Sequence, residues 1–229
     1  METPNNPADM ASLSFPKRFF FGLLRLFFKL LYHQFAWTYD GVASIVSLGA
    51  WQKWVASIVP YIDGPRVLEI GFGPGHLQAA LNQKGIFSFG VDESRQMAAI
   101  ARKRLSKSGY PPNLVRGDAQ LLPFSDSCFN QLVMTFPAEF ILNPSTFAEI
   151  SRVLTAEGEL TMLPLAWITG RSPLARLAAW VNRITGEAPE WDERFLEPLK
   201  SSGFELSWDI LDFSTSRILV VRMRKSSLK

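Results

Sequence analysis

From residue 66 onward, two hydrophobic spacings alternate along the chain. Short runs rich in β-branched and aromatic residues predict strands at 66–70, 87–91, 114–116, 129–135, 159–163, 204–211 and 217–223. Stretches with helical spacing predict helices at 75–84, 93–107, 143–154, 173–184 and 192–201. The alternation predicts an α/β fold, with a doubly wound, seven-stranded and mostly parallel sheet covered by helices on both faces. The last two strands lie too close together for a helical crossover, so we expect an antiparallel C-terminal hairpin.

The first 50 residues have a different pattern. Residues 1–14 are polar and contain prolines, which predicts a disordered tail. Residues 15–39 are mostly Phe and Leu, and the basic residues follow one stripe of a predicted amphipathic helix: Arg18, Arg25, Lys29 and His33. The uninterrupted apolar run is too short to span a bilayer, which takes roughly 20 residues.

Two interpretations of this helix remain open. A basic stripe beside a wide aromatic surface fits an anionic membrane surface, bound through residues 15–34. The same apolar face also fits a lid that packs on the rest of the protein. We therefore divide the chain into a tail at 1–14, a lid or membrane-associating segment at 15–50, and an α/β domain at 51–229. Residues 166–203 form a substrate-side insertion in that domain.

Composition narrows the chemistry. The net charge of +3 gives little support to a nucleic-acid partner, and we expect none. Cys128 is the single cysteine and there are two histidines, so we expect neither an intrachain disulfide nor a metal site. These features fit a cytoplasmic protein, with peripheral membrane association as an addition.

The stretch VLEIGFGPGH, residues 67–76, contains the strongest motif. Gly71, Gly73 and Gly75 follow a predicted strand, where a backbone must approach a ligand closely. The dinucleotide fingerprint G-x-G-x-x-G needs a glycine where His76 stands. Glu69 would repel a pyrophosphate and would suit a ligand with cationic groups. An NAD-linked oxidoreductase is therefore disfavoured.

Together with its flanking motifs, E-x-G-x-G-x-G resembles motif I of the class I S-adenosylmethionine-dependent methyltransferases. Val91–Ser94, Gly117–Ala119, Leu122–Phe129 and Glu149–Leu160 resemble the later motifs of these enzymes in order and spacing. The segment FAWTYD at 35–40 resembles the branch that methylates quinones and related small molecules. The resemblance implies a Rossmann-like fold.

The resemblance also implies S-adenosyl-L-methionine as cofactor. The resemblance implies that Asp92 binds the ribose hydroxyls, that Asp118 lies near the adenine and that Tyr39 lies over the cofactor. The full set of residues that we expect to bind the cofactor is Tyr39, Glu69, Gly71, Phe72, Gly73, Gly75, Asp92, Glu93, Met97, Asp118, Ala119, Thr135 and Phe136.

Methyl transfer is an in-line displacement on an activated sulfonium, so alignment and desolvation carry much of the catalysis and a general base is optional. Glu139 and His76 are the candidates for such a base. His76 stands at a predicted helix N-terminus, where the dipole disfavours positive charge, so we interpret it as a pocket residue.

The predicted function is a methyltransferase for a small, lipophilic or membrane-associated acceptor. The alternative is a non-catalytic module that binds S-adenosylmethionine for regulation or interaction. The acceptor itself cannot be derived from the motifs, because this scaffold serves oxygen, nitrogen and carbon nucleophiles.

Overall fold

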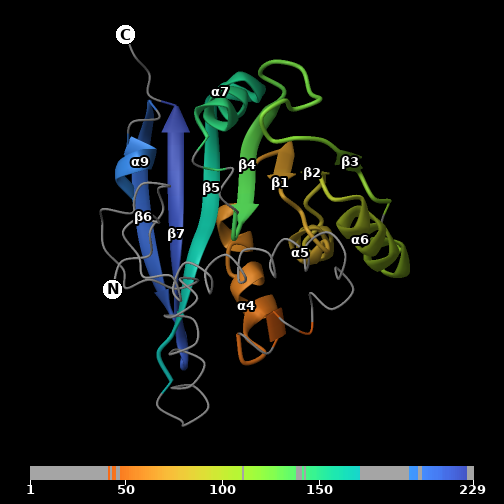
Figure 1. The fold of residues 1–229 in the computed structure, drawn as a ribbon, viewed down its shortest axis with the longest axis vertical. Helices are drawn as coiled ribbons and strands as arrows, with labels where there is room; N and C mark the ends of the chain where they lie inside the picture. The colour runs from red at the N-terminus through yellow and green to blue at the C-terminus, as the bar shows by residue number, and fades with distance from the viewer. Residues whose placement is uncertain are drawn as a thin grey trace, which may run out of the picture.

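The computed structural model describes residues 41, 43–44, 47–109, 111–137, 141, 143–170, 196–200 and 203–225 (Figure 1). Several predictions fall outside these ranges. They are the tail at 1–14, the amphipathic helix with its membrane-binding stretch at 15–34, the helix at 173–184, and the residues Tyr39 and Glu139.

In the described part of the chain, seven strands form one mixed sheet in the order β3-β2-β1-β4-β5-β7-β6 (Figure 1). The strands are β1 (Val67–Ile70), β2 (Ser88–Asp92), β3 (Leu114–Arg116), β4 (Phe129–Thr135), β5 (Leu154–Ile168), β6 (Phe204–Asp212) and β7 (Ser216–Lys225). The first five strands pair in parallel, and β7 is antiparallel to both β5 and β6. The predicted fold and its antiparallel C-terminal hairpin are confirmed.

Helices cover both faces of the sheet, as a doubly wound fold requires. Their bounds are α4 (Trp51–Ala56), η2 (Val59–Tyr61), α5 (His76–Gln83), α6 (Arg95–Lys107), α7 (Pro144–Val153) and α9 (Glu197–Lys200). Side chains of β1 alternate between the two faces. Val67 joins the core formed with α4 and α5, whereas Leu68 and Ile70 join the core formed with α7 and α9. Glu69 alternates with Leu68 and lies on the α5 side, where Gln78 contacts it.

The bounds of one predicted strand are wrong. The strand predicted at 159–163 is longer, because residues 154–158 already belong to β5 and its last residues pair with β7. Between Leu154 and Glu159 the register of β5 against β4 shifts. A Cβ on Gly158 would lie 2.7 Å from Leu154 Cδ2, so the chain folds back on itself too closely for a larger residue.

The short helix α4 is fixed to the far half of the sheet. Trp54 is buried, and its indole N–H donates to the hydroxyl of Ser216 at the start of β7 over 2.8 Å. Val55 packs beside it in the same core. This pairing holds α4 at the end of β4, where α4 forms one wall of the pocket described below.

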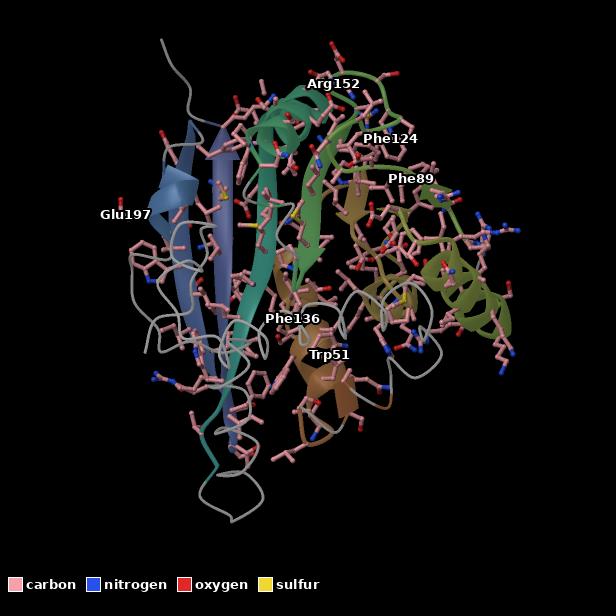
Figure 2. All side chains as sticks on the ribbon, viewed as in Figure 1. Trp51, Phe89, Phe124, Phe136, Arg152 and Glu197 are labelled. Carbon is pink, nitrogen blue, oxygen red and sulfur yellow. The ribbon has the colours of Figure 1, made fainter. Side chains whose placement is uncertain are left out.

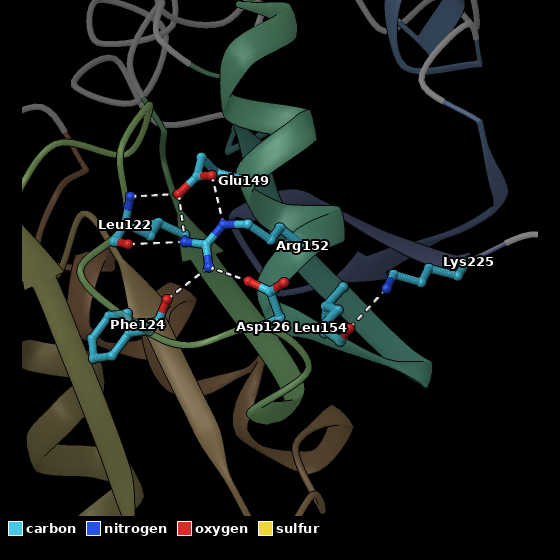
Figure 3. A network of polar contacts seen from close by, with 7 residues as sticks. All are labelled: Leu122, Phe124, Asp126, Glu149, Arg152, Leu154 and Lys225. Atoms are coloured by element: carbon cyan, nitrogen blue, oxygen red, sulfur yellow. Dashed lines mark hydrogen bonds and ion pairs between the residues drawn. The ribbon is translucent and has the colours of Figure 1, made fainter.

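Arg152 on α7 organises the opposite end of the sheet (Figure 3). Its guanidinium donates to both carboxylate oxygens of Glu149 over 2.7 Å, and to Asp126 over 2.8 Å. It also donates to the carbonyls of Leu122 and Phe124 over 2.9 and 2.7 Å. Glu149 in turn accepts the N–H of Leu122 over 2.7 Å. The contacts fix the chain that leads into β4, and the Glu149 hydrogen bond to Arg152 lowers the pKa of that carboxyl.

We expect Arg152→Ala to lower the free energy of unfolding by about 2–4 kcal/mol, because it breaks these hydrogen bonds and leaves Glu149 without its partner. Urea denaturation measures the change. The matched control is Arg217→Ala, which removes an exposed ion pair with Asp212 that water screens and should change stability little. Equal losses in the two variants would contradict a structural role for the Arg152 network.

Candidate functional site

A pocket opens at the carboxyl ends of β1 and β4, the edge where ligands bind in such sheets. Residues from α4, β1, the glycine loop, α5 and β4 line it: Trp51, Val55, Glu69, Gly71, Phe72, Gly73, Pro74, His76, Leu77 and Thr135. Figure 2 shows Trp51 and Phe136 together below the end of β4, at the opposite end of the sheet from Arg152. The pocket is therefore separate from the Arg152 network.

The loop between β1 and α5 has the backbone that its glycines permit. Gly71, Gly73 and Gly75 have φ angles of 75°, 51° and 81°, in the left-handed region that favours glycine. A Cβ on Gly75 would lie 2.8 Å from the Cβ of Ala101, so this glycine also lets α5 approach α6. Arg104 of α6 donates to the Pro74 carbonyl and fixes the loop from outside.

Asp92 connects this loop to the end of β2. Its carboxylate is buried and accepts the N–H of Gly73 and the N–H of Ser94, each over 2.8 Å. Charge-assisted bonds of this kind are about twice as strong as neutral ones. Ser94 also accepts the N–H of Met97 and caps α6, as its position before the helix predicts. The sugar-binding role predicted for Asp92 stays a prediction, and the structure adds a positioning role toward the glycine loop.

Glu69 is the buried acidic residue of the pocket lining. It is 1% exposed, and its carboxylate accepts one hydrogen bond from the Gln78 amide over 2.9 Å. Burial raises the pKa of Glu69 to about 8, and the neighbouring Asp92 adds to the rise while the Gln78 hydrogen bond opposes it. A buried carboxyl in this state gains most from a cationic partner.

The remaining acidic candidates lie along the same edge of the sheet. Glu93 is exposed beside Asp92, and its carbonyl accepts from the Arg116 side chain over 3.0 Å. Asp118 is exposed after β3 and accepts the N–H of Gln120 over 2.8 Å, while Ala119 packs partly against the core. Each follows a parallel strand, so the ends of β1, β2 and β3 bring these residues to one edge.

Two apolar candidates are turned toward the protein interior. The Phe72 ring packs against Ala98 and Leu105 of α6, although the residue also borders the pocket. Met97 is fully buried at the first turn of α6. As placed, both stabilise the walls of the site rather than offering a free side chain to a ligand.

Phe136 follows the pocket residue Thr135 and has a strained backbone. Its φ of 48° is unusual for a residue other than glycine, at a cost of about 1–2 kcal/mol. The hydrogen bond of its N–H to the Leu163 carbonyl, 2.7 Å, holds this conformation. Its ring stacks on Trp51, with the ring centroids 4.3 Å apart. The Trp54 ring lies beside the pair, with its centroid 6.2 Å from that of Phe136.

Sequence reasoning missed the α4 wall. Trp51 and Val55 stand four residues apart on one face of α4, a spacing that predicts a helix with a shared apolar face. This signal was present in WQKWVA but gave no indication that the face borders a ligand site. Gln78 was also missed, since its contact with Glu69 becomes visible only when α5 packs on β1.

The pocket fits S-adenosylmethionine. The buried carboxyl of Glu69 lines it, and Asp92 holds the adjoining glycine loop. None of the described lining residues is a lysine or arginine, so the lining favours a cationic ligand over an anionic one. The glycine loop exposes backbone at the same place. Within the described ranges, no three His, Cys, Asp or Glu side chains gather as a metal site.

Comparisons with known proteins agree with this site. The methyltransferase domain family model matches residues 68–162. The demethylmenaquinone methyltransferase of Thermotoga maritima is 28% identical over 217 residues, which cover 83% of this chain and 93% of that enzyme. The demethylmenaquinone methyltransferase of Symbiobacterium thermophilum is 32% identical over 58% of this chain and 57% of its own length. A solved SAM-dependent methyltransferase of Methanosarcina mazei shares the fold, with a TM-score of 0.52, 20% identity and coverage of 74% and 96%.

The fold and the glycine-loop pocket define a class I nucleotide-binding domain of the methyltransferase type. With the family match and the curated relatives, the chain is a class I S-adenosylmethionine-dependent methyltransferase, and S-adenosylmethionine is its cofactor. The non-catalytic alternative is not favoured, since the curated relatives are methyltransferases. Several of those relatives align over only 55–57% of their own length, so their names do not identify the methyl acceptor of this chain.

We expect Asp92→Ala to weaken S-adenosylmethionine binding by about 100-fold, because it removes two charge-assisted hydrogen bonds that hold the glycine loop. Isothermal titration calorimetry measures the dissociation constant. Asp212→Ala is the control, since that exposed carboxylate lies on β6 at the other edge of the sheet. Unchanged affinity in Asp92→Ala would refute the role of this carboxylate in the cofactor site.

Proposed function

We propose that this enzyme methylates a lipophilic aromatic small molecule, with the ring of a reduced quinone as the leading candidate. The observation that carries the proposal is the stacked pair of Trp51 and Phe136 at the cofactor pocket. Stacked aromatic side chains form a flat apolar wall, against which another aromatic ring gains further stacking. The names of the two relatives, both demethylmenaquinone methyltransferases, support a quinone-type acceptor.

When bound, S-adenosylmethionine supplies an electrophilic methyl group on a positively charged sulfur. The residues of this chain position the reactants and exclude water from them. The loop at Gly71–Gly75 and Asp92 fix the cofactor, and the wall of Trp51, Val55 and Phe136 keeps water from the reacting end. Holding two reactants in line can replace an effective concentration of about 10⁵ M or more, so no metal and no triad is required.

A proton must leave an acceptor hydroxyl or ring carbon at some stage of such a reaction. His76, the first residue of α5, borders the pocket and is the described candidate for this role. Glu139, the other candidate, lies outside the described residues. Both remain proposals as bases, and the reduced ring of a quinone needs only weak base assistance because it is already electron-rich.

We expect the purified enzyme to form S-adenosylhomocysteine with a short-chain reduced naphthoquinone that lacks the ring methyl group, and not with simple amines. Trp51→Ala should raise the acceptor KM by about 10-fold or more, with a smaller effect on the cofactor dissociation constant, because a stacking surface is lost. Trp51→Phe should restore most of the affinity. Steady-state assays with mass detection of the product measure all three.

Phe87→Ala is the matched control for this series, because Phe87 is an exposed aromatic residue just before β2, at the amino end of the sheet. Its acceptor KM should stay near that of the wild type. Methylation of amines but not of the quinol would contradict the proposed acceptor class. Cofactor binding without transfer to either class would favour the non-catalytic module instead.

We also propose that residues 15–34 bring the enzyme to an anionic membrane surface, where a lipophilic acceptor is dissolved. The support is the basic stripe on an aromatic helix pattern, which lies outside the described residues. In the described part of the chain, no helix has the length and apolarity needed to cross a bilayer.

Liposome sedimentation tests this association. The full chain should sediment with vesicles that contain anionic lipid, and less so as salt rises, because the basic stripe is screened. Deletion of residues 1–34 should leave the protein in the supernatant. If the truncated protein sediments as before, the N-terminal segment is not the membrane contact.

A further inference from the structure

A chain of three buried polar side chains leads away from the pocket into the protein. Ser88 donates its hydroxyl proton to the Gln78 carbonyl oxygen over 3.0 Å, and the Gln78 amide donates to Glu69 over 2.9 Å. The second amide N–H of Gln78 donates to the Phe89 carbonyl over 3.2 Å. Glu69 and Gln78 are each 1% exposed and Ser88 is 3% exposed. Buried polar groups of this kind are costly unless each is paired, and here every Gln78 amide atom has a partner.

The pairing fixes which way the Gln78 amide points. A flipped amide would place its oxygen against both the Glu69 carboxyl and the Phe89 carbonyl, and its N–H groups against Ser88. The Phe89 carbonyl, which can only accept, therefore selects the orientation in which Gln78 donates to Glu69, and the Ser88 hydroxyl pairs the amide oxygen in that orientation. This places a defined donor on one oxygen of Glu69, on the interior side of a carboxyl that borders the pocket.

Few charged groups face Glu69 from the elements around it. Asp92 at the end of β2 is the negative neighbour, and His76 at the start of α5 borders the same pocket. On the other sides, β4 contributes Val133 and Thr135, and α4 contributes apolar and aromatic side chains to the pocket wall. No lysine or arginine among the described pocket residues neutralises Glu69.

Burial raises the pKa of Glu69 to about 8, so about nine-tenths of the donor-free molecules carry a proton on this carboxyl at pH 7. Gln78 works in the opposite direction, since its hydrogen bond stabilises the carboxylate and lowers the pKa. S-adenosylmethionine carries a positive sulfur and an ammonium group, and a cation within a few ångströms favours the ionised carboxylate.

We propose that Ser88 and Gln78 are positioning residues for Glu69, and that binding of the cationic methyl donor expels the Glu69 proton to solvent. The O–H bond of the carboxyl breaks, the electron pair stays on the carboxylate next to the donor cation, and buffer takes up the proton. The proposal deepens the function above and rests on binding of the donor in this pocket.

Calorimetric titration of the protein with S-adenosylmethionine, in buffers of different ionisation enthalpy, measures the number of protons released on binding. At pH 7 the wild type should release about 0.7–0.9 proton per S-adenosylmethionine bound, and Glu69→Gln close to none. The wild-type affinity should rise up to about ninefold from pH 6 to pH 7, because the fraction of ionised Glu69 rises by that factor. The same titration with S-adenosylhomocysteine, which keeps the ammonium but lacks the positive sulfur, assigns the effect to one of the two cations.

The positioning role predicts that Gln78→Leu loses affinity for S-adenosylmethionine by an amount that depends on pH. Without the Gln78 hydrogen bond the pKa of Glu69 is higher still, so the dissociation constant at pH 7 should rise on the order of tenfold. At pH 9 Glu69 is largely ionised in the wild type and partly so in the variant, so the two constants should converge to within about twofold. Dividing the dissociation constant of the variant by that of the wild type at each pH removes the effect of titration of the donor's own amino group.

Two further variants keep the test sharp. Ser88→Ala retains Gln78 but removes the hydrogen bond to its amide oxygen, so it should show a smaller loss with the same convergence at pH 9. Gln131→Leu is the matched control, since Gln131 is a buried glutamine on β4 whose amide bonds go to the chain at 61–64 and to Thr161. It should lower stability and leave the proton release unchanged.

The donor-free protein gives an independent readout. Because folding raises the pKa of Glu69, the folded state keeps a proton that the unfolded chain loses near pH 4.5, so this carboxyl stabilises the fold at low pH. Its contribution should decline as pH rises from about 5 through 8. Urea denaturation across this range should therefore show a steeper fall in stability for the wild type than for Glu69→Gln.

The outcomes separate this inference from the proposed function. Tight donor binding with no buffer-dependent heat, or a Gln78→Leu loss that is equal at pH 7 and pH 9, overturns the proton release and the positioning role while leaving the methyltransferase intact. Absence of donor binding by the wild type at every pH overturns both. Proton release in the wild type, its loss in Glu69→Gln and convergence in Gln78→Leu together support the proposal.

Discussion

The candidate cofactor site depends on how the Asp92 carboxylate joins two strand ends. Asp92 closes β2, and its two oxygens accept N–H groups from the glycine loop after β1 and from the first turn before α6. Three glycines with positive φ make the loop permissive, so without an external contact it would have several backbone conformations available. A buried carboxylate that takes one donor from each side selects one of them. The glycine loop that lines the pocket is therefore held by a buried carboxylate on the neighbouring strand.

That arrangement explains why buried acidic groups are tolerated here. Burying a carboxylate without partners costs several kcal/mol, and the usual response is protonation or pairing. Asp92 is paired with backbone N–H groups, whereas Glu69 has a single amide donor and a pKa raised to about 8. Asp92 therefore has two hydrogen-bond donors for its carboxylate, and Glu69 has one. This difference makes Glu69 the group that can respond to a positively charged ligand.

Much of the fold follows from local sequence signals, and the exceptions have identifiable causes. β4 occupies the residues expected for it, because an apolar run bounded by polar turns has few alternatives. β5 is longer than expected, because its first and last parts are set by pairing with β4 and β7 and their own composition does not indicate a strand. Local patterns also do not show that β7 lies between β5 and β6, since strand order depends on contacts distant in sequence.

For the site, the motif order indicates which loops meet, and the parallel sheet brings their ends to one edge. The pattern does not reveal which side chains turn inward. Phe72 and Met97 pack largely inside, and their binding of the cofactor stays a prediction. It also misses partners that act across elements. Gln78 stands in a helix whose apolar neighbours Leu77 and Leu81 face the core, and its value becomes visible only through Glu69 on β1 and Ser88 on β2. A buried polar residue on an apolar helix face can therefore shift the pKa of a residue in a known site. The sequence alone does not show this contact.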